Sequence, residues 1–368
     1  MAENLKQARR MTMNSLALRM SDMVANLRGA YVLSRLRPMI MHIAQKASAQ
    51  FDASESEPWV MLKRNRAQGD REVLWLGSAN QKTVLICHIP RSKSAVLRYQ
   101  HHRDICASLW NTRVLGVWRE VLPRVLYQGL YENHLYWLEA PLPGVSASRV
   151  IQQSKRRDIV LRAAVETILC LHQRTSRVVT FDEILFKKWV LDPLRAIRES
   201  TLPLYYFRSH AILSEIEQRL ARRLLGKPVT VCWIHGDYWP ENILVTPDGA
   251  RVTGIVDWEL SHPDGLPLID LINLLLSTYR VLEAKELGHL IIELLEQGEL
   301  PPEWKTIYDE VCQRLGNNLP AIQDVLILFW IQHTSTKVFA ANRLFINPFW
   351  ARANYVSVLR HLNKLWGG

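Results

Sequence analysis

The chain has 368 residues and a formal net charge of +11, and 48% of its residues are hydrophobic. This composition is that of a folded globular protein of about two domains, and it excludes collagen-like, mucin-like and mainly disordered chains. The excess of basic residues favours anionic partners, such as nucleotide phosphates, nucleic acid or an acidic membrane surface, without choosing among them.

The cysteines indicate a protein of a reducing compartment, and the apolar runs indicate a protein without a membrane span. Five cysteines are scattered through the chain with no C-x-x-C pair, so neither a disulfide framework nor a zinc-binding spacing is indicated. A cytoplasmic location is expected. The longest apolar run, Val325 to Ile331, is far shorter than the roughly 20 residues that cross a bilayer. No transmembrane helix and no secretory signal are predicted.

Residues 1–57 are expected to form a basic helical extension followed by a linker. Apolar side chains recur at three- and four-residue steps, which predicts one or two helices over residues 12–46. Docking of these helices on their own domain is the favoured interpretation, and peripheral contact with an acidic membrane is the alternative. Their basic, serine-containing character also leaves an organellar presequence open. The stretch from Ser48 to Pro58 is typical of a linker.

Residues 58–139 are predicted to form a small domain with a sheet and one helix. The strand-like segments are Glu72–Leu76, Thr83–Ile89 and Tyr136–Leu138. A stretch with helical spacing, Ser94–Trp110, lies between the second and the third of them.

Residues 140–368 are predicted to form a larger, mainly helical domain, with no internal repeat and no low-complexity tract. Its segments with helical spacing or long apolar faces are residues 148–172, 210–225, 268–282, 284–296, 303–315 and 321–341.

The most informative stretch of this second domain contains a predicted β-hairpin. Thr246-Pro247-Asp248-Gly249 has the composition of a turn, and it stands between the apolar runs Ile243–Val245 and Val252–Val256. Folding the hairpin brings its two outer ends together. Asn242 and Asp257, at those ends, are therefore expected to face one point.

The residue types at this point favour phosphoryl transfer. Mg²⁺ prefers oxygen ligands and keeps waters and phosphate oxygens in the rest of its shell, which suits Asn242 and Asp257. Asp237, on the entering loop, is placed to accept the proton of an attacking hydroxyl and to orient its oxygen. Because the transition state is loose, positioning and charge neutralisation suffice, and no nucleophilic Ser or Cys is required.

The motifs His235-Gly236-Asp237-x-x-x-x-Asn242 and Ile255-Val256-Asp257-Trp258-Glu259 resemble those of the aminoglycoside phosphotransferase and choline kinase superfamily. The resemblance covers roughly Trp59 to Leu359. It implies an α+β, two-lobed protein-kinase-like fold with a small antiparallel-sheet N-lobe and a larger helical C-lobe. The helical extension would precede the N-lobe.

The resemblance also implies a role for each residue of the two motifs. Asp237 would be the catalytic base, and Asn242 and Asp257 would bind Mg²⁺. His235 would support the catalytic loop. Asp270 matches a helical Asp that braces this loop in the family.

An ATP site on the N-lobe is a further implication of the resemblance. The segment from Tyr136 to Gly144 looks like the last N-lobe strand and hinge, where backbone groups of Glu139 and Ala140 would contact adenine. Ser78 and Asn80, in a short turn, would cover the phosphates.

One position of the N-lobe departs from the family. The strand that ends near Ile89 normally carries a Lys that holds the α- and β-phosphates, and here the aligned residue is His88. A neutral imidazole binds phosphate weakly, whereas a protonated one can serve, since its ordinary pKa of about 6.5 is raised by an anion. The partner Glu is also missing, because the next helix offers only Asp104, and Arg91 or Lys93 is an alternative phosphate ligand.

The favoured function is an ATP-dependent kinase that phosphorylates a hydroxyl of a sugar, amino alcohol or aminoglycoside-like molecule. His88 motivates the alternative of a pseudokinase or nucleotide-binding scaffold. A protein kinase is disfavoured because Asp-Phe-Gly and Ala-Pro-Glu are missing after the metal motif. A nucleic-acid module is disfavoured by the dispersed charge. The acceptor, the choice of ATP or GTP and the oligomeric state are left open by the sequence.

Overall fold

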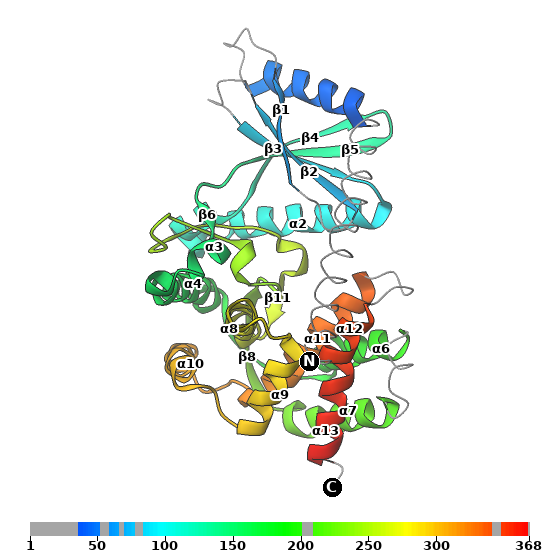
Figure 1. Ribbon diagram of the computed structural model, residues 1–368, viewed down its shortest axis with the longest axis vertical. Helices are drawn as coiled ribbons and strands as arrows, with labels where there is room; N and C mark the ends of the chain where they lie inside the picture. Colours follow the sequence, from blue (N-terminus) through cyan, green and yellow to red (C-terminus); the bar gives the residue numbers. More distant parts are fainter. Residues whose placement is uncertain are drawn as a thin grey trace, which may run out of the picture. The chain divides into compact units, whose positions relative to one another are not determined.

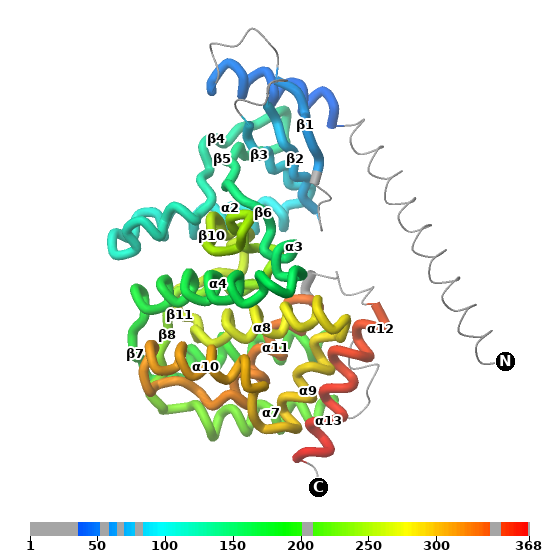
Figure 2. The backbone as a smooth tube through the Cα atoms, turned by 60° about the vertical axis from the view of Figure 1, so that its left-hand side comes forward, coloured from blue at the N-terminus to red at the C-terminus, as the bar shows by residue number. Residues whose placement is uncertain are grey.

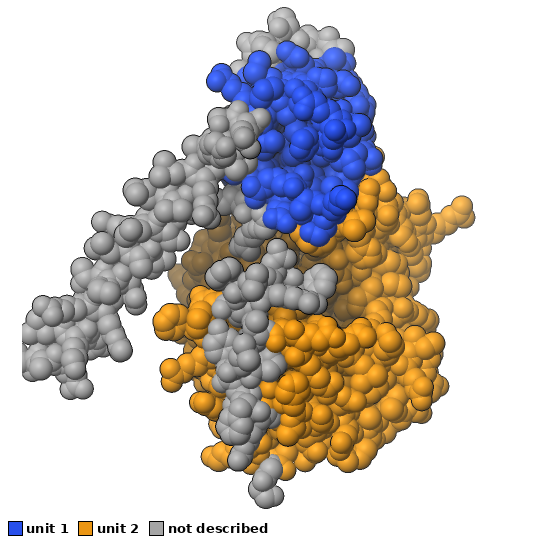
Figure 3. All heavy atoms as spheres, turned by 90° about the vertical axis from the view of Figure 1, so that its right-hand side faces the viewer, with its two compact units in different colours: residues 1–96, 125–141 blue, residues 97–124, 142–368 orange. Residues whose placement is uncertain are grey.

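The computed structural model describes residues 36–51, 59–65, 70–77, 84–200, 209–340 and 347–366. The chain forms two compact units, of which the first comprises residues 1–96 and 125–141 and the second residues 97–124 and 142–368 (Figure 3). Residues 97–124 therefore belong to the second unit, although the sequence prediction assigned them to the small domain.

The first unit is built on a five-stranded sheet in the order β1-β2-β3-β5-β4 (Figure 1). Its strands are β1 (Val60–Asn65), β2 (Arg71–Gly77), β3 (Val84–Pro90), β4 (Arg124–Tyr131) and β5 (His134–Ala140). The pairs β1–β2, β2–β3 and β3–β5 are antiparallel, as the resemblance implied. Alternate residues such as Leu74 and Leu76 are fully buried, as expected for a strand with one face on a core.

A helix over residues 36–51, blue in Figure 1, packs against this sheet. Its buried side chains Met39, Ile40 and Ile43 share a core with strand residues such as Leu74. For these residues the structure agrees with the docked interpretation, since the apolar face lies against the protein's own sheet.

The same helix is longer than the sequence predicted. Residues 48–51, assigned to the linker, are helical, because Ala47 and Phe51 continue the apolar spacing and pack on the same core. Residues 12–35 of the predicted extension lie outside the described residues.

The second unit is mainly helical, and α2 (Lys93–Asn111) enters it from the first. The other helices are α3 (Ala147–Ile151), α4 (Ser154–Thr175), α5 (Glu183–Phe186), α6 (Asp192–Arg198), α7 (Ser209–Leu224), α8 (Pro267–Glu283), α9 (Leu287–Gln297), α10 (Pro302–Leu315), α11 (Ile322–Ala340), α12 (Pro348–Ala351) and α13 (Ser357–Trp366). Short 3₁₀ helices cover Arg113–Val121, Pro240–Asn242 and Trp258–Leu260, and π-helical segments cover Lys187–Leu191 and Arg352–Val356.

Two of the predicted helices have different limits. The segment 148–172 is divided into α3 and α4, with Gln152 and Gln153 between them. The segment 284–296 begins only at Leu287, because Ala284 has a φ of 51° and ends α8. A left-handed residue cannot continue a right-handed helix.

Two small sheets of the second unit position the site. One has the order β11-β8-β7, with β8 (Pro228–Ile234) between β11 (His262–Gly265) and β7 (Arg177–Thr180). The other has the order β10-β9-β6 and contains the predicted hairpin of β9 (Ile243–Val245) and β10 (Val252–Ile255), with β6 (Val145–Ser146) at its edge. Helices α4 and α8 pack against β8 (Figure 2). Helix α8 is buried from Pro267 to Thr278, which is typical of a central helix.

Within the part of the chain that the structure describes, no helix is long and apolar enough to cross a bilayer. The five cysteines all lie among the described residues, and each is a free thiol.

Candidate active site

The candidate catalytic loop begins where the buried strand β8 ends. Gly236 turns the chain with a φ of +80°, and a Cβ at this position would lie 2.5 Å from the carbonyl oxygen of Leu260. Only glycine satisfies both conditions without strain. The tight turn then presents the next residue, Asp237, to a pocket.

Asp270, on the first turn of α8, braces this loop. Its Oδ2 accepts the backbone N–H of His235 at 2.8 Å, and its Oδ1 accepts that of Gly236 at 2.9 Å. His172 of α4 donates from Nε2 to Oδ2 at 3.1 Å. The carboxylate is fully buried, which by itself raises its pKa, but these hydrogen bonds and the nearby histidines hold the pKa of Asp270 below its usual value.

His235 connects the catalytic loop to the far end of the hairpin. Its Nδ1 accepts the backbone N–H of Asp237 at 3.2 Å, and its Nε2 lies 2.9 Å from the carbonyl oxygen of Val256. This pattern assigns the proton to Nε2. The ring is fully buried and meets the ring of Trp258 edge-on at 4.6 Å. The buried ring of His235 therefore links the loop to the end of the hairpin.

Two amide side chains hold the Asp237 carboxylate. Asn242 donates from Nδ2 to Oδ2 at 3.2 Å, and Asn273 of α8 donates to Oδ1 at 3.5 Å. Burial raises the pKa of Asp237, and the charge of Asp257 adds to this rise, although His235, Lys337 and the Asn273 hydrogen bond act in the opposite direction. A base with a raised pKa holds a proton more firmly once it has accepted it.

The hairpin pairs the backbone of its two outer ends, next to Asn242 and Asp257. Ile243 pairs with Ile255, and the N–H of Val256 donates to the carbonyl oxygen of Asn242 at 2.9 Å. Asp257 follows with a φ of 68°, a left-handed conformation that is uncommon outside glycine and recurs at functional sites.

The same residues fit a magnesium ion. The Nδ2 of Asn242 donates to both the backbone and the carboxylate of Asp237, so its Oδ1 is the atom that can bind a cation. An amide and the carboxylate of Asp257 form a sparse set, and Mg²⁺ is usually held by one or two carboxylates with waters and substrate phosphates. Among the described residues no cluster of three or more His, Cys, Asp or Glu side chains forms a denser metal site.

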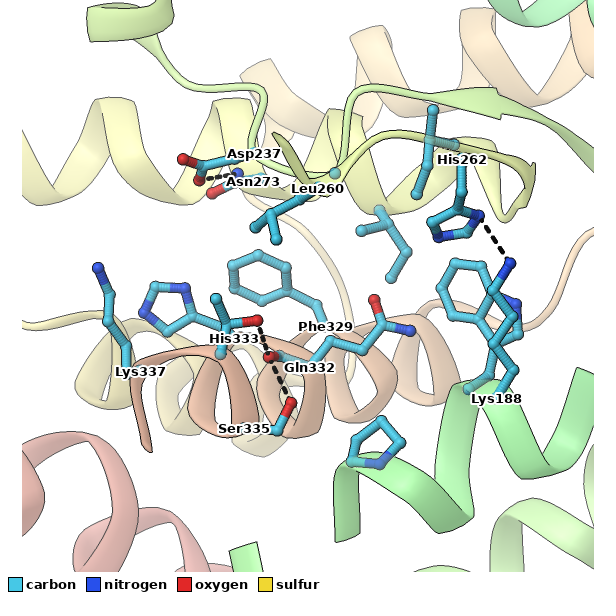
Figure 4. Close-up of a pocket in the computed structure, with 16 residues that line it drawn as sticks. Lys188, Asp237, Leu260, His262, Asn273, Phe329, Gln332, His333, Ser335 and Lys337 are labelled. Carbon is cyan, nitrogen blue, oxygen red and sulfur yellow. Dashed lines mark hydrogen bonds between the residues drawn. The ribbon is translucent and has the colours of Figure 1, made fainter. Parts of the chain in front are cut away.

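A pocket of about 260 Å³ lies beside Asp237, and Figure 4 shows its lining. Among the polar residues of this lining that sequence reasoning missed are Lys188, Asn273, His333 and Lys337. A signal existed only for Asn273, because it follows Asp270 by three residues and so shares a face of α8. The other three come from distant segments that only the fold brings together.

Helix α2 anchors the metal motif within the second unit. Arg98 lies 3.4 Å from the carboxylate of Glu259, and the Nδ1 of the buried His102 accepts the N–H of Trp258 at 3.2 Å. Asp104, the only acidic candidate for the missing Glu of this helix, is 64% exposed and pairs with its neighbour Arg103.

The predicted nucleotide residues of the first unit have mixed outcomes. Ser78 and Asn80 lie outside the described residues. Glu139 and Ala140 end β5, and the buried Nε2 of His88 on β3 lies 3.7 Å from the Oε2 of Glu139.

Arg91, an alternative phosphate ligand in the sequence, already has an acidic partner. Its Nε lies 3.5 Å from the Oε1 of the buried Glu72, and Arg64 donates to the Oε2 of the same carboxylate at 2.8 Å. His88 and Lys93 thus remain the candidates for binding phosphate.

One unit contains a five-stranded antiparallel sheet. The other is a helical scaffold that places Asp237 near Asn242 and Asp257. Together they define a kinase-like phosphotransferase fold. The sequence profile of the phosphotransferase enzyme family matches residues 62–307, and the chain belongs to this family. The fold class and the family that the motifs implied are confirmed.

Individual relatives are distant. An aminoglycoside 3′-phosphotransferase of Streptomyces ribosidificus is 27% identical over 140 residues, which are 37% of this chain and 51% of that enzyme, so the match spans about half of the relative's length. The ethanolamine kinase of Plasmodium vivax is 13% identical, with a TM-score of 0.50 and 85% of each chain covered. A GDP complex of an aminoglycoside 2′-phosphotransferase is 15% identical, with a TM-score of 0.50 and 89% of this chain and 99% of that one covered. The two solved structures are similar to this chain in fold.

Proposed function

We propose that the protein transfers the γ-phosphate of ATP to a hydroxyl group of a small molecule. The observation that carries this proposal is the Asp237 carboxylate, which lines a pocket and is held by Asn242 and Asn273. Membership of a phosphotransferase family supports the reaction class, and the GDP complex of a structural relative supports the use of a nucleotide. The free cysteines support the cytoplasm as the location.

In this proposal the side chains position the reactants and move one proton. Asp237 accepts the hydroxyl proton as the acceptor oxygen bonds to the γ-phosphorus and the bond from that phosphorus to ADP breaks. Asn242 orients Asp237 through Nδ2, and Asn242 and Asp257 would hold Mg²⁺. The ion, when bound, neutralises charge on the phosphates.

The first test is the metal dependence of phosphate transfer. ADP release is measured with Mg²⁺ and ATP over a panel of sugars and amino alcohols, and it is expected to stop on addition of EDTA and to return when Mg²⁺ is restored. Asp257→Asn is expected to raise the Mg²⁺ concentration for half-maximal rate at least tenfold, since it removes the charged ligand. Asp248→Asn, at the turn of the same hairpin, is the matched control and should leave this concentration unchanged. Transfer that persists in EDTA contradicts the metal site.

A nucleotide-binding scaffold is the second candidate, and His88 is the observation that favours it. The residue stands where the family has a lysine, and it is buried beside Glu139. A scaffold would bind ATP without releasing ADP with any acceptor of the panel. Calorimetry with ATP and Mg²⁺, run beside the transfer assay, separates the two functions.

His88→Lys is expected to bind ATP about tenfold more tightly than the wild type. The new ammonium group has Glu139 within reach and adds one charge-assisted hydrogen bond to the phosphates. His134→Lys, an exposed position on β5 of the same sheet, is the control for added charge. Unchanged or weaker ATP binding by His88→Lys, with the control equal to the wild type, would show that residue 88 does not face the phosphates.

A further inference from the structure

The pocket beside Asp237 has a basic lining. Lys188 and Lys337 both line it, and Asp237 is the only carboxylate among the described residues of its wall. Asp237 serves as the proposed base, so no other acidic side chain of the described lining is available to bind a cationic acceptor. Several relatives are named as aminoglycoside phosphotransferases, and aminoglycosides carry several amino groups. A pocket for such a cationic acceptor would be expected to contain more carboxylates.

The charged side chains lie at two ends of the pocket (Figure 4). Asp237 and Lys337 lie toward one end, and the charge of Lys337 lowers the pKa of Asp237. Lys188 and His262 lie at the other end, joined by a hydrogen bond of 3.2 Å. The apolar side chains of Leu260 and Phe329 lie between the two ends.

The end that holds Lys188 keeps a net positive charge. Asp264 lies 3.6 Å from the Nζ of Lys188, but Asp264 is also hydrogen-bonded to Arg177, which offsets its charge. Burial, followed by the charge of Lys188, lowers the pKa of His262 to about 4, so the imidazole is neutral at neutral pH. Its Nδ1 can then accept a hydrogen bond from Lys188.

The position of Lys188 in the chain agrees with a binding role. It lies on the π-helical segment Lys187–Leu191. Such segments are rare in proteins overall, and those that occur are often at functional sites. The neighbouring Lys187 does not line the pocket and pairs with Asp192 at 2.9 Å. The two adjacent lysines therefore have different surroundings.

We infer that the acceptor carries an anionic group, a carboxylate or a phosphate, at the end opposite its reacting hydroxyl. The inference rests on the proposed function, because it places the hydroxyl at Asp237. The anion binds Lys188, and the carbon skeleton lies against Leu260 and Phe329. A polyamine would instead bring ammonium groups against both lysines, which like charges oppose. The volume of about 260 Å³ is slightly below that of most drug-sized sites and suits a compact acceptor.

Binding of matched sugars without nucleotide tests this inference independently of phosphate transfer. Glucosamine, glucose, glucuronate and glucose 1-phosphate differ in the charge of one substituent. Calorimetry is expected to show that an anionic sugar binds the full chain at least tenfold more tightly than glucosamine, and less so at high salt. Lys188→Met is expected to remove this difference, and Lys187→Met, the matched control, to retain it.

The outcomes separate the inference from the proposed function. Tighter binding of glucuronate than of glucose 1-phosphate identifies a carboxylate acceptor, and the reverse identifies a phosphate ester. Glucosamine binding as tightly as the anions, or no binding of any of the four sugars, contradicts the inference and leaves phosphate transfer to its own assay. Anion binding that Lys188→Met abolishes, in a protein that transfers no phosphate, contradicts the proposed function while the preference of the pocket for anions stands.

Discussion

Asp237→Asn is expected to lower kcat by about 10²–10⁴-fold, the usual contribution of a general base. The amide keeps the size of the carboxylate but cannot accept the hydroxyl proton. Asn242 and Asn273, which hold the carboxylate, remain in place, so the KM for ATP should change little. Steady-state rates of ADP release for the two proteins give this comparison.

The pH profile of the same variant provides a second readout. The raised pKa of Asp237 means that the wild-type rate should rise with pH through a value above that of an ordinary aspartate. The fall in rate at acidic pH is caused by protonation of Asp237, which then cannot accept the hydroxyl proton. In Asp237→Asn the residual rate should lack this fall, and an unchanged fall would assign the titration to another group.

Unfolding is not expected to explain the loss of activity. Because the folded state holds the proton of Asp237 more tightly than the unfolded state, the stability from this group is complete at low pH and is lost as pH rises through the folded pKa. At neutral pH the ionised carboxylate therefore destabilises the fold, and the neutral amide removes that effect. Because the new amide can accept from only one of Asn242 and Asn273, this gain is offset, and the Tm of Asp237→Asn at neutral pH should lie close to that of the wild type. Full turnover by this variant would remove Asp237 from the mechanism.

The candidate site could largely be located from the sequence because its geometry is local. The turn at residues 246–249 sets the register of the hairpin, and that register alone places Asn242 beside Val256 and Asp257. The bracing role of Asp270 was an implication of the resemblance, and its two backbone hydrogen bonds agree with it. Short sequence separations and strong turn chemistry made these expectations possible.

The acceptor pocket could not be predicted, because its lining has no local pattern. Lys188 comes from a π-helical segment before α6, and Lys337 comes from the last turn of α11. In the sequence each is one basic residue among 46. Only the packing of α11 against α6 and α8 brings these segments to the same cavity. The charge of the pocket is thus a property of tertiary structure.

The sequence was also unable to distinguish functional from structural partners near the motifs. Glu259 stands at the end of the metal motif in the sequence, and in the structure it pairs with Arg98 of α2. The boundary between the two units likewise lies inside α2, a continuous helix with no composition change to mark it. Contacts over long sequence distances decide both features.

Asp270 connects the stability of the fold to the geometry of the catalytic loop. Its folded pKa is lowered, so the stability that it contributes is present above the unfolded pKa and is lost as pH falls through the folded value. Both of its oxygens accept backbone N–H groups of the loop, and His172 supplies a third hydrogen bond. An asparagine in its place can accept on one side only and turns an N–H₂ group toward a donor.

Asp270→Asn is therefore expected to lose about 3 kcal/mol of unfolding free energy, the scale of charged hydrogen bonds broken in a buried site. Because the N–H groups of His235 and Gly236 lose their common acceptor, Asp237 should shift, and kcat should fall at least tenfold at temperatures where the variant is fully folded. Asp324→Asn is the matched control, since Asp324 is also buried and accepts two hydrogen bonds from Arg223, but lies on α11 outside the pocket lining. It should lose stability by urea unfolding while keeping its kcat. Equal kcat losses in both variants would reduce the role of Asp270 to general stability, whereas a loss confined to Asp270→Asn assigns it the positioning of the base.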